Sequence, residues 1–155
     1  MKQTHSPPPL NSAHHAWKSR NSPKEEVPPI NPESLIESLG LTLIETRDLD
    51  PRFNAVYLHH RRAIVIQKDL DPYTRRCCLA HEIGHAVYGD TEHGNPRLER
   101  RADLFAANLL ISIDEYAAAE TLHEGNAGAI AHELGVTPNL LKLWKTDVER
   151  KRIAS

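Results

Sequence analysis

The sequence of 155 residues contains little cysteine and no long apolar run. Its two cysteines, Cys77 and Cys78, are neighbours in the chain. Adjacent residues of a helix point in different directions and rarely form a disulfide, which excludes a disulfide-stabilised fold. No segment approaches the roughly 20 apolar residues that a membrane-spanning helix needs. The N-terminal residues lack the apolar core of a secretory signal, so we expect a cytoplasmic protein.

The sequence also lacks an internal repeat and a strong excess of either charge. A formal net charge of −2 predicts no general attraction to nucleic acid or to anionic membranes. Charge is nevertheless uneven, because residues 31–125 contain sixteen acidic and ten basic residues, whereas residues 126–155 contain three and five. Hydrophobic residues make up 39% of the chain, which is sufficient for one modest core.

Composition divides the chain into three segments. Residues 1–32 hold seven of the eleven prolines and few aliphatic residues. Such a segment buries too little apolar surface to offset its ordering entropy, so we predict a disordered tail. Residues 33–125 are expected to form a folded core, and residues 126–155 a helical unit packed on that core.

Residue patterns within the core predict an α+β fold. A short helix at 33–39 ends at Gly40, and strand-like runs follow at 41–45, 54–58 and 63–67. A turn at 59–62 joins the last two runs, which suggests a small, mainly antiparallel three-stranded sheet. Asp71 and Pro72 are typical of a helix start, and this helix should reach about Tyr88. Further helices are expected at 96–110, 114–122, 127–134 and 138–150.

The helix expected at 72–88 carries the sequence His81-Glu82-Ile83-Gly84-His85. Positions i and i+4 share one helix face, so His81 and His85 can bind a single ion. Zinc favours imidazole ligands and keeps an open position when the protein supplies three ligands. Glu82 could then take a proton from the zinc-bound water and deliver it to a leaving amine. The alternative is a chance match on a helix with two surface histidines, but polar residues in so apolar a segment are costly without a purpose.

A third ligand is expected on the next helix. Glu99 follows His85 by fourteen residues, and Asp103 lies four residues further along the same helix face. We predict Glu99 as the third zinc ligand and Asp103 as the acceptor of a histidine N–H. Surface ion pairing with neighbouring arginines is the alternative for Glu99. Three loop residues are further candidate donors, although a loop would hold them less rigidly: Asp90, Glu92 and His93.

Two blocks of sequence, LAHEIGHA at 79–86 and ERRADLFAANLLI at 99–111, closely resemble the ImmA/IrrE family of metallo-endopeptidases. Members of that family show HExxH followed by E-x-x-A-(N/D)-x-F-A-A-x-L-L-(M/I), preceded by a small sheet. The likeness covers about residues 34–145. It implies a zincin-like fold for residues 33–125 and cleavage of a partner regulator, often the repressor of a phage or mobile element. Many relatives have Asn at the position of Asp103 and Met-Pro at Ile111-Ser112.

Other side chains near the motif have less specific interpretations. Cys77 and Cys78 lie one helical turn before His81 and Glu82, where a thiolate could ligate zinc, but core packing is favoured because three ligands are already in place. Several residues could polarise the scissile carbonyl, and the sequence does not choose among them: Tyr57, Tyr73, Tyr88, Tyr116 and His123.

Residues 127–144 carry the pattern of a helix-turn-helix, with the small Ala131 followed four residues later by Gly135. Basic side chains that would suit phosphates follow: Lys142, Lys145, Arg150, Lys151 and Arg152. Asp147 and Glu149 interrupt this basic face, so packing or substrate docking is the favoured role. Two hypotheses remain, a zinc endopeptidase acting on a regulatory protein and a DNA-binding transcription regulator with a degenerate peptidase site. The intact Glu82 favours the first.

Overall fold

The computed structural model describes residues 30–155, so most of the expected disordered tail lies outside the described residues. Helix α2 (Pro32–Ser38) begins one residue before the expected boundary at 33. The Asn31 side chain caps this helix by accepting hydrogen bonds from the N–H groups of Glu33 and Ser34, and Pro32 is buried. Within the described part of the chain, no helix is both long and apolar enough to span a bilayer.

A three-stranded sheet follows α2 and consists of β1 (Thr42–Thr46), β2 (Ala55–Leu58) and β3 (Ala63–Gln67). The strand order is β1-β3-β2, so β3 is central and β2 lies at an edge. Strand β3 pairs in parallel with β1 and antiparallel with β2. The sheet is therefore mixed, whereas the sequence suggested a mainly antiparallel one.

The central position of β3 agrees with its burial. Ala63, Ile64 and Ile66 are at most 2% exposed, and a strand buried this fully belongs in the centre of a sheet. The chain passes from β1 to the far edge before it returns through the short 3-10 helix η1 (His59–Arg61). Arg62, with φ of 49°, closes this hairpin in the left-handed region.

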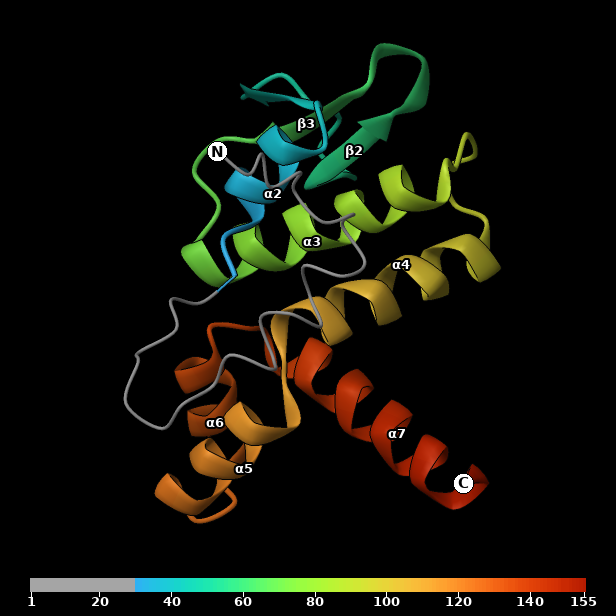
Figure 1. Ribbon diagram of the computed structural model, residues 1–155. Helices are drawn as coiled ribbons and strands as arrows, with labels where there is room; N and C mark the ends of the chain where they lie inside the picture. Colours follow the sequence, from blue (N-terminus) through green and yellow to red (C-terminus); the bar gives the residue numbers. More distant parts are fainter. Residues whose placement is uncertain (1–29) are drawn as a thin grey trace, which may run out of the picture.

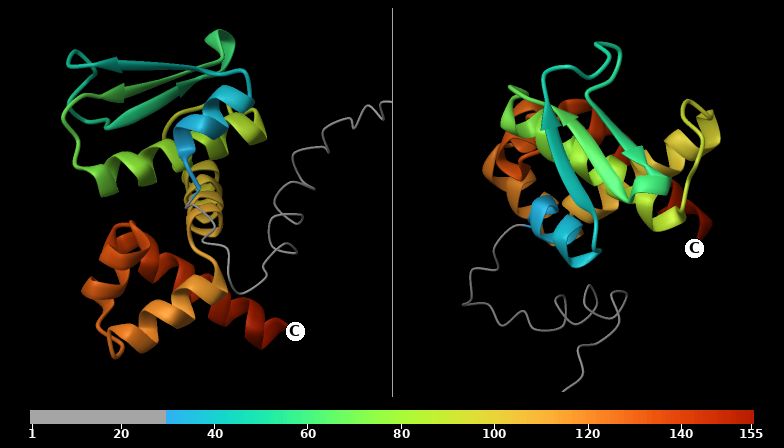
Figure 2. Two further views of the ribbon diagram at one scale, coloured as in Figure 1. Left: turned by 60° about the vertical axis from the view of Figure 1, so that its left-hand side comes forward. Right: turned by 90° about the horizontal axis from the view of Figure 1, so that it is seen from above.

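Five further helices complete the α+β fold of residues 30–155. Helix α3 (Pro72–Tyr88) lies against the sheet, and α4 (Pro96–Leu110) packs along α3 (Figure 1). Helices α5 (Ile113–Leu122), α6 (Ala127–Leu134) and α7 (Pro138–Ala154) gather at the end of the molecule opposite the sheet (Figure 2). The bounds of α3, α4 and α6 agree with those expected from the sequence, whereas α7 continues four residues past Arg150.

Helix α3 contributes to both clusters of buried side chains. Its residues Leu79, Ile83 and Ala86 pack with the sheet and α2, while Ala80 packs with the C-terminal helices. The cluster under the sheet contains Ile36, Leu41, Tyr57, Ile64, Ile66, Leu79, Ile83 and Ala86. The other contains Ala80, Ala106, Ala107, Leu110, Ile111, Ala119, Ile130, Ala131, Val136, Leu140, Leu141 and Trp144. Because α4 to α7 share this second cluster, the boundary expected at 125/126 falls between helices of one core.

Gly84 allows α3 and α4 to approach closely. A Cβ atom at this position would lie 3.2 Å from the Cα atom of Ala102 and 3.1 Å from the Phe105 ring. Only glycine fits this contact without displacing a neighbour. Gly84 lies between His81 and His85 in the sequence of α3. The close approach at Gly84 therefore brings both histidines near the side chains of α4.

Candidate metal centre

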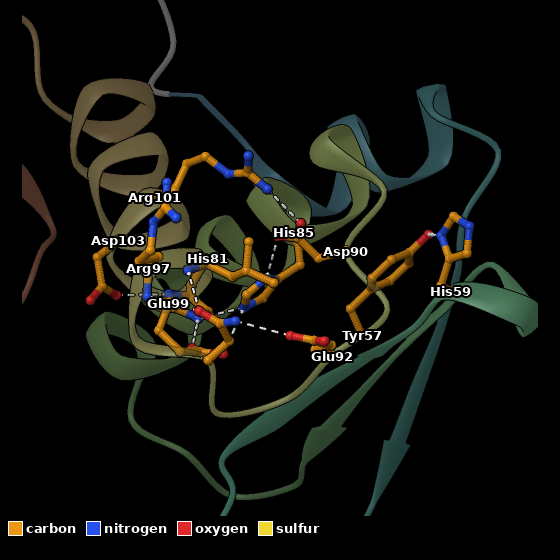
Figure 3. Close-up of polar contacts among 12 residues, drawn as sticks. Tyr57, His59, His81, His85, Asp90, Glu92, Arg97, Glu99, Arg101 and Asp103 are labelled. Carbon is orange, nitrogen blue, oxygen red and sulfur yellow. Dashed lines mark hydrogen bonds and ion pairs between the residues drawn. The ribbon is translucent and has the colours of Figure 1, made fainter.

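Helix α3 places His81 and His85 on the face that looks toward α4 (Figure 3). The helix starts at Asp71, whose side chain accepts hydrogen bonds from the N–H groups of Tyr73 and Thr74, and it ends at Gly89 with φ of 68°. The two imidazole rings lie 4.7 Å apart in an edge-to-face arrangement. Their spacing is the expected result of an i, i+4 pair on one helix face.

Three donor groups converge between α3 and α4. The Nε2 atoms of His81 and His85 are 3.1 Å apart, and they lie 2.9 and 3.3 Å from the two carboxylate oxygens of Glu99. A tetrahedral zinc ion with bonds of about 2.0 Å would separate its donors by about 3.3 Å. The donors of these three residues, and of no other group of three in the described part of the chain, have the type and spacing of such a site.

The outer nitrogen of each histidine contacts a carboxylate. His81 Nδ1 lies 2.7 Å from Asp103, and His85 Nδ1 lies 2.9 Å from Asp90. Ionised carboxylates only accept hydrogen bonds, so in the neutral form each ring donates from Nδ1 and turns the lone pair of Nε2 inward. Two lone pairs and the Glu99 carboxylate then face one another, an arrangement that a cation stabilises.

The electrostatics of His81 also favour a cation. Burial lowers its pKa, but the hydrogen bond with Asp103 and the charges of Glu82, Asp103 and Glu99 outweigh burial and raise the pKa to about 9. Surroundings that stabilise a proton on this ring also stabilise a metal ion beside it. Metal binding would displace that proton.

Glu82 lies between the two histidines in sequence and is 7% exposed. Burial raises the pKa of its carboxyl, while His81 and His85 act in the opposite direction. The main-chain N–H of Tyr57 on β2 is directed at the carboxylate and favours its ionised form. A carboxylate with a raised pKa accepts a proton more readily than an exposed glutamate, as a general base must.

A cleft of about 390 Å³ opens beside these groups and is lined by His81, Glu82, Glu99 and Asp103 at one end. It continues along α3 past Cys78 and Thr74. One wall is formed by residues 52–55, where the chain enters β2. The other is formed by the start of α7, with Thr137, Asn139, Leu140 and Leu143.

The three loop residues considered as alternative zinc ligands, Asp90, Glu92 and His93, do not belong to the cluster of His81, His85 and Glu99. Glu92 accepts a hydrogen bond from Asn95 Nδ2 at 3.0 Å, and His93 is exposed. Asp90 contacts the outer nitrogen of His85, a role that the sequence analysis missed. The signal was available in Gly89, because a glycine stop reverses the chain and returns the next residue to the last helical turn. Arg101 pairs with Asp90 and not with Glu99, whose carboxylate contacts His81 and His85.

Cys77 and Cys78 are both half-buried and line the cleft. Cys77 packs against the C-terminal cluster and Cys78 against the cluster under the sheet, in agreement with the expected packing role. Burial raises the pKa of both thiols, that of Cys78 to about 11.

The five residues considered as carbonyl-polarising groups do not line the cleft, and two of them contact histidines instead. The Tyr57 hydroxyl is 3.1 Å from His59 Nδ1, and the Tyr73 hydroxyl is 2.9 Å from His132 Nδ1. None of the five is among the described residues that line the cleft: Tyr57, Tyr73, Tyr88, Tyr116 and His123. Asn54 and Asn139, which do line it, were not considered from the sequence because nothing in their local sequence places them near the motif.

Comparison with known families agrees with this geometry. The family model of the peptidase M78 group, described as the IrrE N-terminal-like domain, matches residues 36–143, from within α2 to the first part of α7. No curated protein matches the chain.

Proposed function

The chain belongs to the peptidase M78, or ImmA/IrrE, family of metallopeptidases, and on this premise we propose that it is a zinc-dependent endopeptidase acting on a regulatory protein. The observation that supports this most directly is the convergence of His81, His85 and Glu99 beside the buried Glu82. Imidazole and carboxylate donors at this spacing fit zinc, and three protein ligands leave a position open for chemistry.

Glu82 carries the proton transfers of the proposed reaction. A bound zinc ion would polarise the scissile carbonyl and lower the pKa of a coordinated water. Glu82 accepts the proton of the attacking water and returns it to the leaving nitrogen, two steps that its raised pKa suits. His81 and His85 are held by Asp103 and Asp90, so that both Nε2 atoms keep their direction during these steps.

Edge strand β2 supports binding of an extended peptide. The Asn54 carbonyl accepts a hydrogen bond from the Gln67 N–H at 2.8 Å, so Asn54 is a hydrogen-bonded partner of the β3 side. Main-chain groups alternate along an antiparallel pair, and those of Ala55 and Tyr57 therefore face away from β3. Ala55 lines the cleft, where a substrate segment could add to the sheet beside Glu82.

The walls of the cleft favour an apolar substrate side chain near the scissile bond. Phe53 is 40% exposed on one wall, and Leu140 and Leu143 of α7 form the other. The start of α7 thus borders the peptidase cleft, which supports a role in substrate docking for the helix-turn-helix-like unit.

The test is incubation of the zinc-loaded protein with candidate regulators, first of all repressors encoded near its gene. Discrete fragments should appear with the wild type and disappear when a chelator is added or Glu82 is replaced by glutamine. Cleavage that persists in both controls would assign the activity to a contaminant. A zinc-loaded protein that leaves every candidate intact would contradict a repressor as the substrate.

A further inference from the structure

Asp90, the first residue beyond the glycine that ends α3, connects a histidine of the metal centre to an arginine of α4. Its Oδ2 atom is 2.9 Å from His85 Nδ1, and its Oδ1 atom is 2.5 Å from Nη2 of Arg101. The Asp90 side chain is 5% exposed. We propose that Asp90 and Arg101 form a positioning pair that fixes the orientation of His85 and thereby sets the metal affinity of the centre.

The backbone holds Asp90 in place for this contact. Gly89 adopts φ of 68°, its N–H donates to the Ala86 carbonyl at 3.2 Å, and the Asp90 N–H donates to the His85 carbonyl at 3.0 Å. These two bonds form the helix-ending arrangement in which the chain folds back on its last turn. Asp90 is therefore bound to His85 twice, once through the main chain and once through the side chains.

Arg101 holds the other end of the carboxylate. Its guanidinium lies 4.0 Å from the centre of the Tyr88 ring, on the last residue of α3, while it pairs with Asp90. A buried carboxylate is costly unless its oxygens are paired, and a planar guanidinium that is also stacked on a ring has little freedom to move away. Arg101 thus ties the orientation of His85 to the packing of α4 against α3.

The pair at His85 differs from the contact at His81. Asp103 makes the equivalent contact with His81 Nδ1, but its side chain is 49% exposed and it belongs to the helix that carries Glu99. Asp90 is enclosed and has a second charged partner. Because buried contacts are screened less by water, we assign the larger share of positioning to Asp90.

The positioning role of Asp90 and Arg101 depends on the proposed metal centre, so zinc affinity, and not proteolysis, tests it. Zinc dissociation constants would be measured by competition with a chromogenic chelator, and cobalt substitution would report ligand geometry through its visible spectrum. Asp90→Asn should weaken zinc binding about 10- to 100-fold and alter the cobalt bands. Arg101→Ala should weaken it as well, and Arg101→Lys should restore part of the loss, since lysine keeps the charge but not the stacked plane.

Two nearby exposed residues serve as matched controls. Glu92→Gln on the same loop and Arg97→Ala on the same helix should bind zinc with wild-type affinity. The double variant Asp90→Asn/Arg101→Ala should lose no more affinity than Asp90→Asn alone, because Arg101 acts through Asp90.

Wild-type affinity and an unchanged cobalt spectrum in Asp90→Asn would overturn the proposal. Fully additive losses in the double variant would overturn the role of Arg101. Should Asp90→Asn fail to fold, the two Arg101 variants decide the question, because that side chain is 42% exposed. A wild-type protein that binds no zinc at all would be a different result, since it would refute the metal centre itself.

Discussion

Glu82 is the residue on which the proposed reaction depends most directly. Glutamine has the same shape but cannot accept a proton, so Glu82→Gln should retain one zinc ion and the native fold. Loss of a general base reduces rates about 10²- to 10⁴-fold, which we expect for cleavage of the protein substrate. Initial rates together with metal content test this. Cleavage at the wild-type rate would show that another group removes the proton.

The metal ligands permit a matched comparison of two histidines. His85→Ala removes one of three donors and should reduce bound zinc from about one equivalent to a small fraction, because an open three-ligand site becomes a two-ligand site. His93→Ala, on the loop outside the cluster, should keep its zinc. Elemental analysis of both purified variants measures this. Retention of a full equivalent by His85→Ala would refute the ligand set.

The Cys78 thiol should react slowly with alkylating agents at neutral pH. Burial, together with the charges of Cys77 and Glu82, raises its pKa to about 11, and only the thiolate is nucleophilic. A raised pKa of an acid keeps the neutral form to higher pH, so the alkylation rate should still be rising at pH 10. Mass spectrometry of iodoacetamide-treated protein over a pH series provides the measurement. A rate that levels off near pH 8.5 would contradict it.

At the residue scale, the sequence describes best the groups that lie within one helix. His81 and His85 share one helix face through their i, i+4 spacing, which needs no tertiary information, while the roles of these residues and of Glu82 stay predictions. The contacts of Glu99 and Asp103 require that α4 packs with the correct face toward α3, and the structure brings both to the histidines. Asp90 was expected only as one of three alternative loop donors, and its contact with His85 Nδ1 was not predicted because it arises from a turn, whose geometry periodicity does not describe.

At the scale of elements, the contact between α3 and α4 depends on Gly84. Gly84→Val would place methyl groups against the Ala102 backbone and the Phe105 ring, so it should lower stability by about 1–3 kcal/mol. It should also weaken zinc binding, because Glu99 moves away from the histidines. Denaturant unfolding and zinc titration measure the two effects.

Gly128 is the matched control for this substitution. A Cβ atom there would meet only the Asn126 side chain, at 3.5 Å, near the start of α6. Gly128→Val should therefore change stability and zinc binding little. Equal losses in the two variants would show that valine itself, and not the approach of α3 to α4, is responsible.

The sequence predicted the elements better than their pairing. Apolar runs in the sequence predicted the positions of β1, β2 and β3 along the chain. Such runs do not indicate the order of the strands in the sheet. The central place of β3 depends on its burial under α3, and the parallel pairing of β1 with β3 depends on the path of the chain between β1 and β2, neither of which a local pattern describes. Helix bounds were more accurate because caps such as Asp71 and Gly89 act within a few residues.

At the scale of the whole molecule, variants of the C-terminal helical unit can distinguish a peptidase from a DNA-binding regulator. Lys142 and Lys145 are both exposed on α7, near the cleft wall formed by Leu143. If α7 serves the peptidase, Lys142→Glu with Lys145→Glu should impair substrate cleavage or have no effect, and zinc content should be unchanged. We expect no sequence-selective DNA complex from the wild type.

Gel-shift titrations over a salt series, run in parallel with cleavage assays, measure both outcomes. A nanomolar, sequence-selective complex at physiological salt that the double variant abolishes would favour the regulator. Weak binding that disappears with added salt would not, since many mildly basic helices behave in this way.

Both clusters of buried side chains include residues of α3, which affects how the protein unfolds. Neither cluster can lose its packing without disturbing the helix on which the other depends, so both should unfold in one cooperative transition. A ligand that binds only the native state stabilises every part of such a unit equally. A zinc ion held between α3 and α4 would then protect the region around Trp144 as well as the sheet. The supply of zinc would thus govern how long the folded part of the chain that the structure describes, residues 30–155, resists degradation, in addition to whether its active site works.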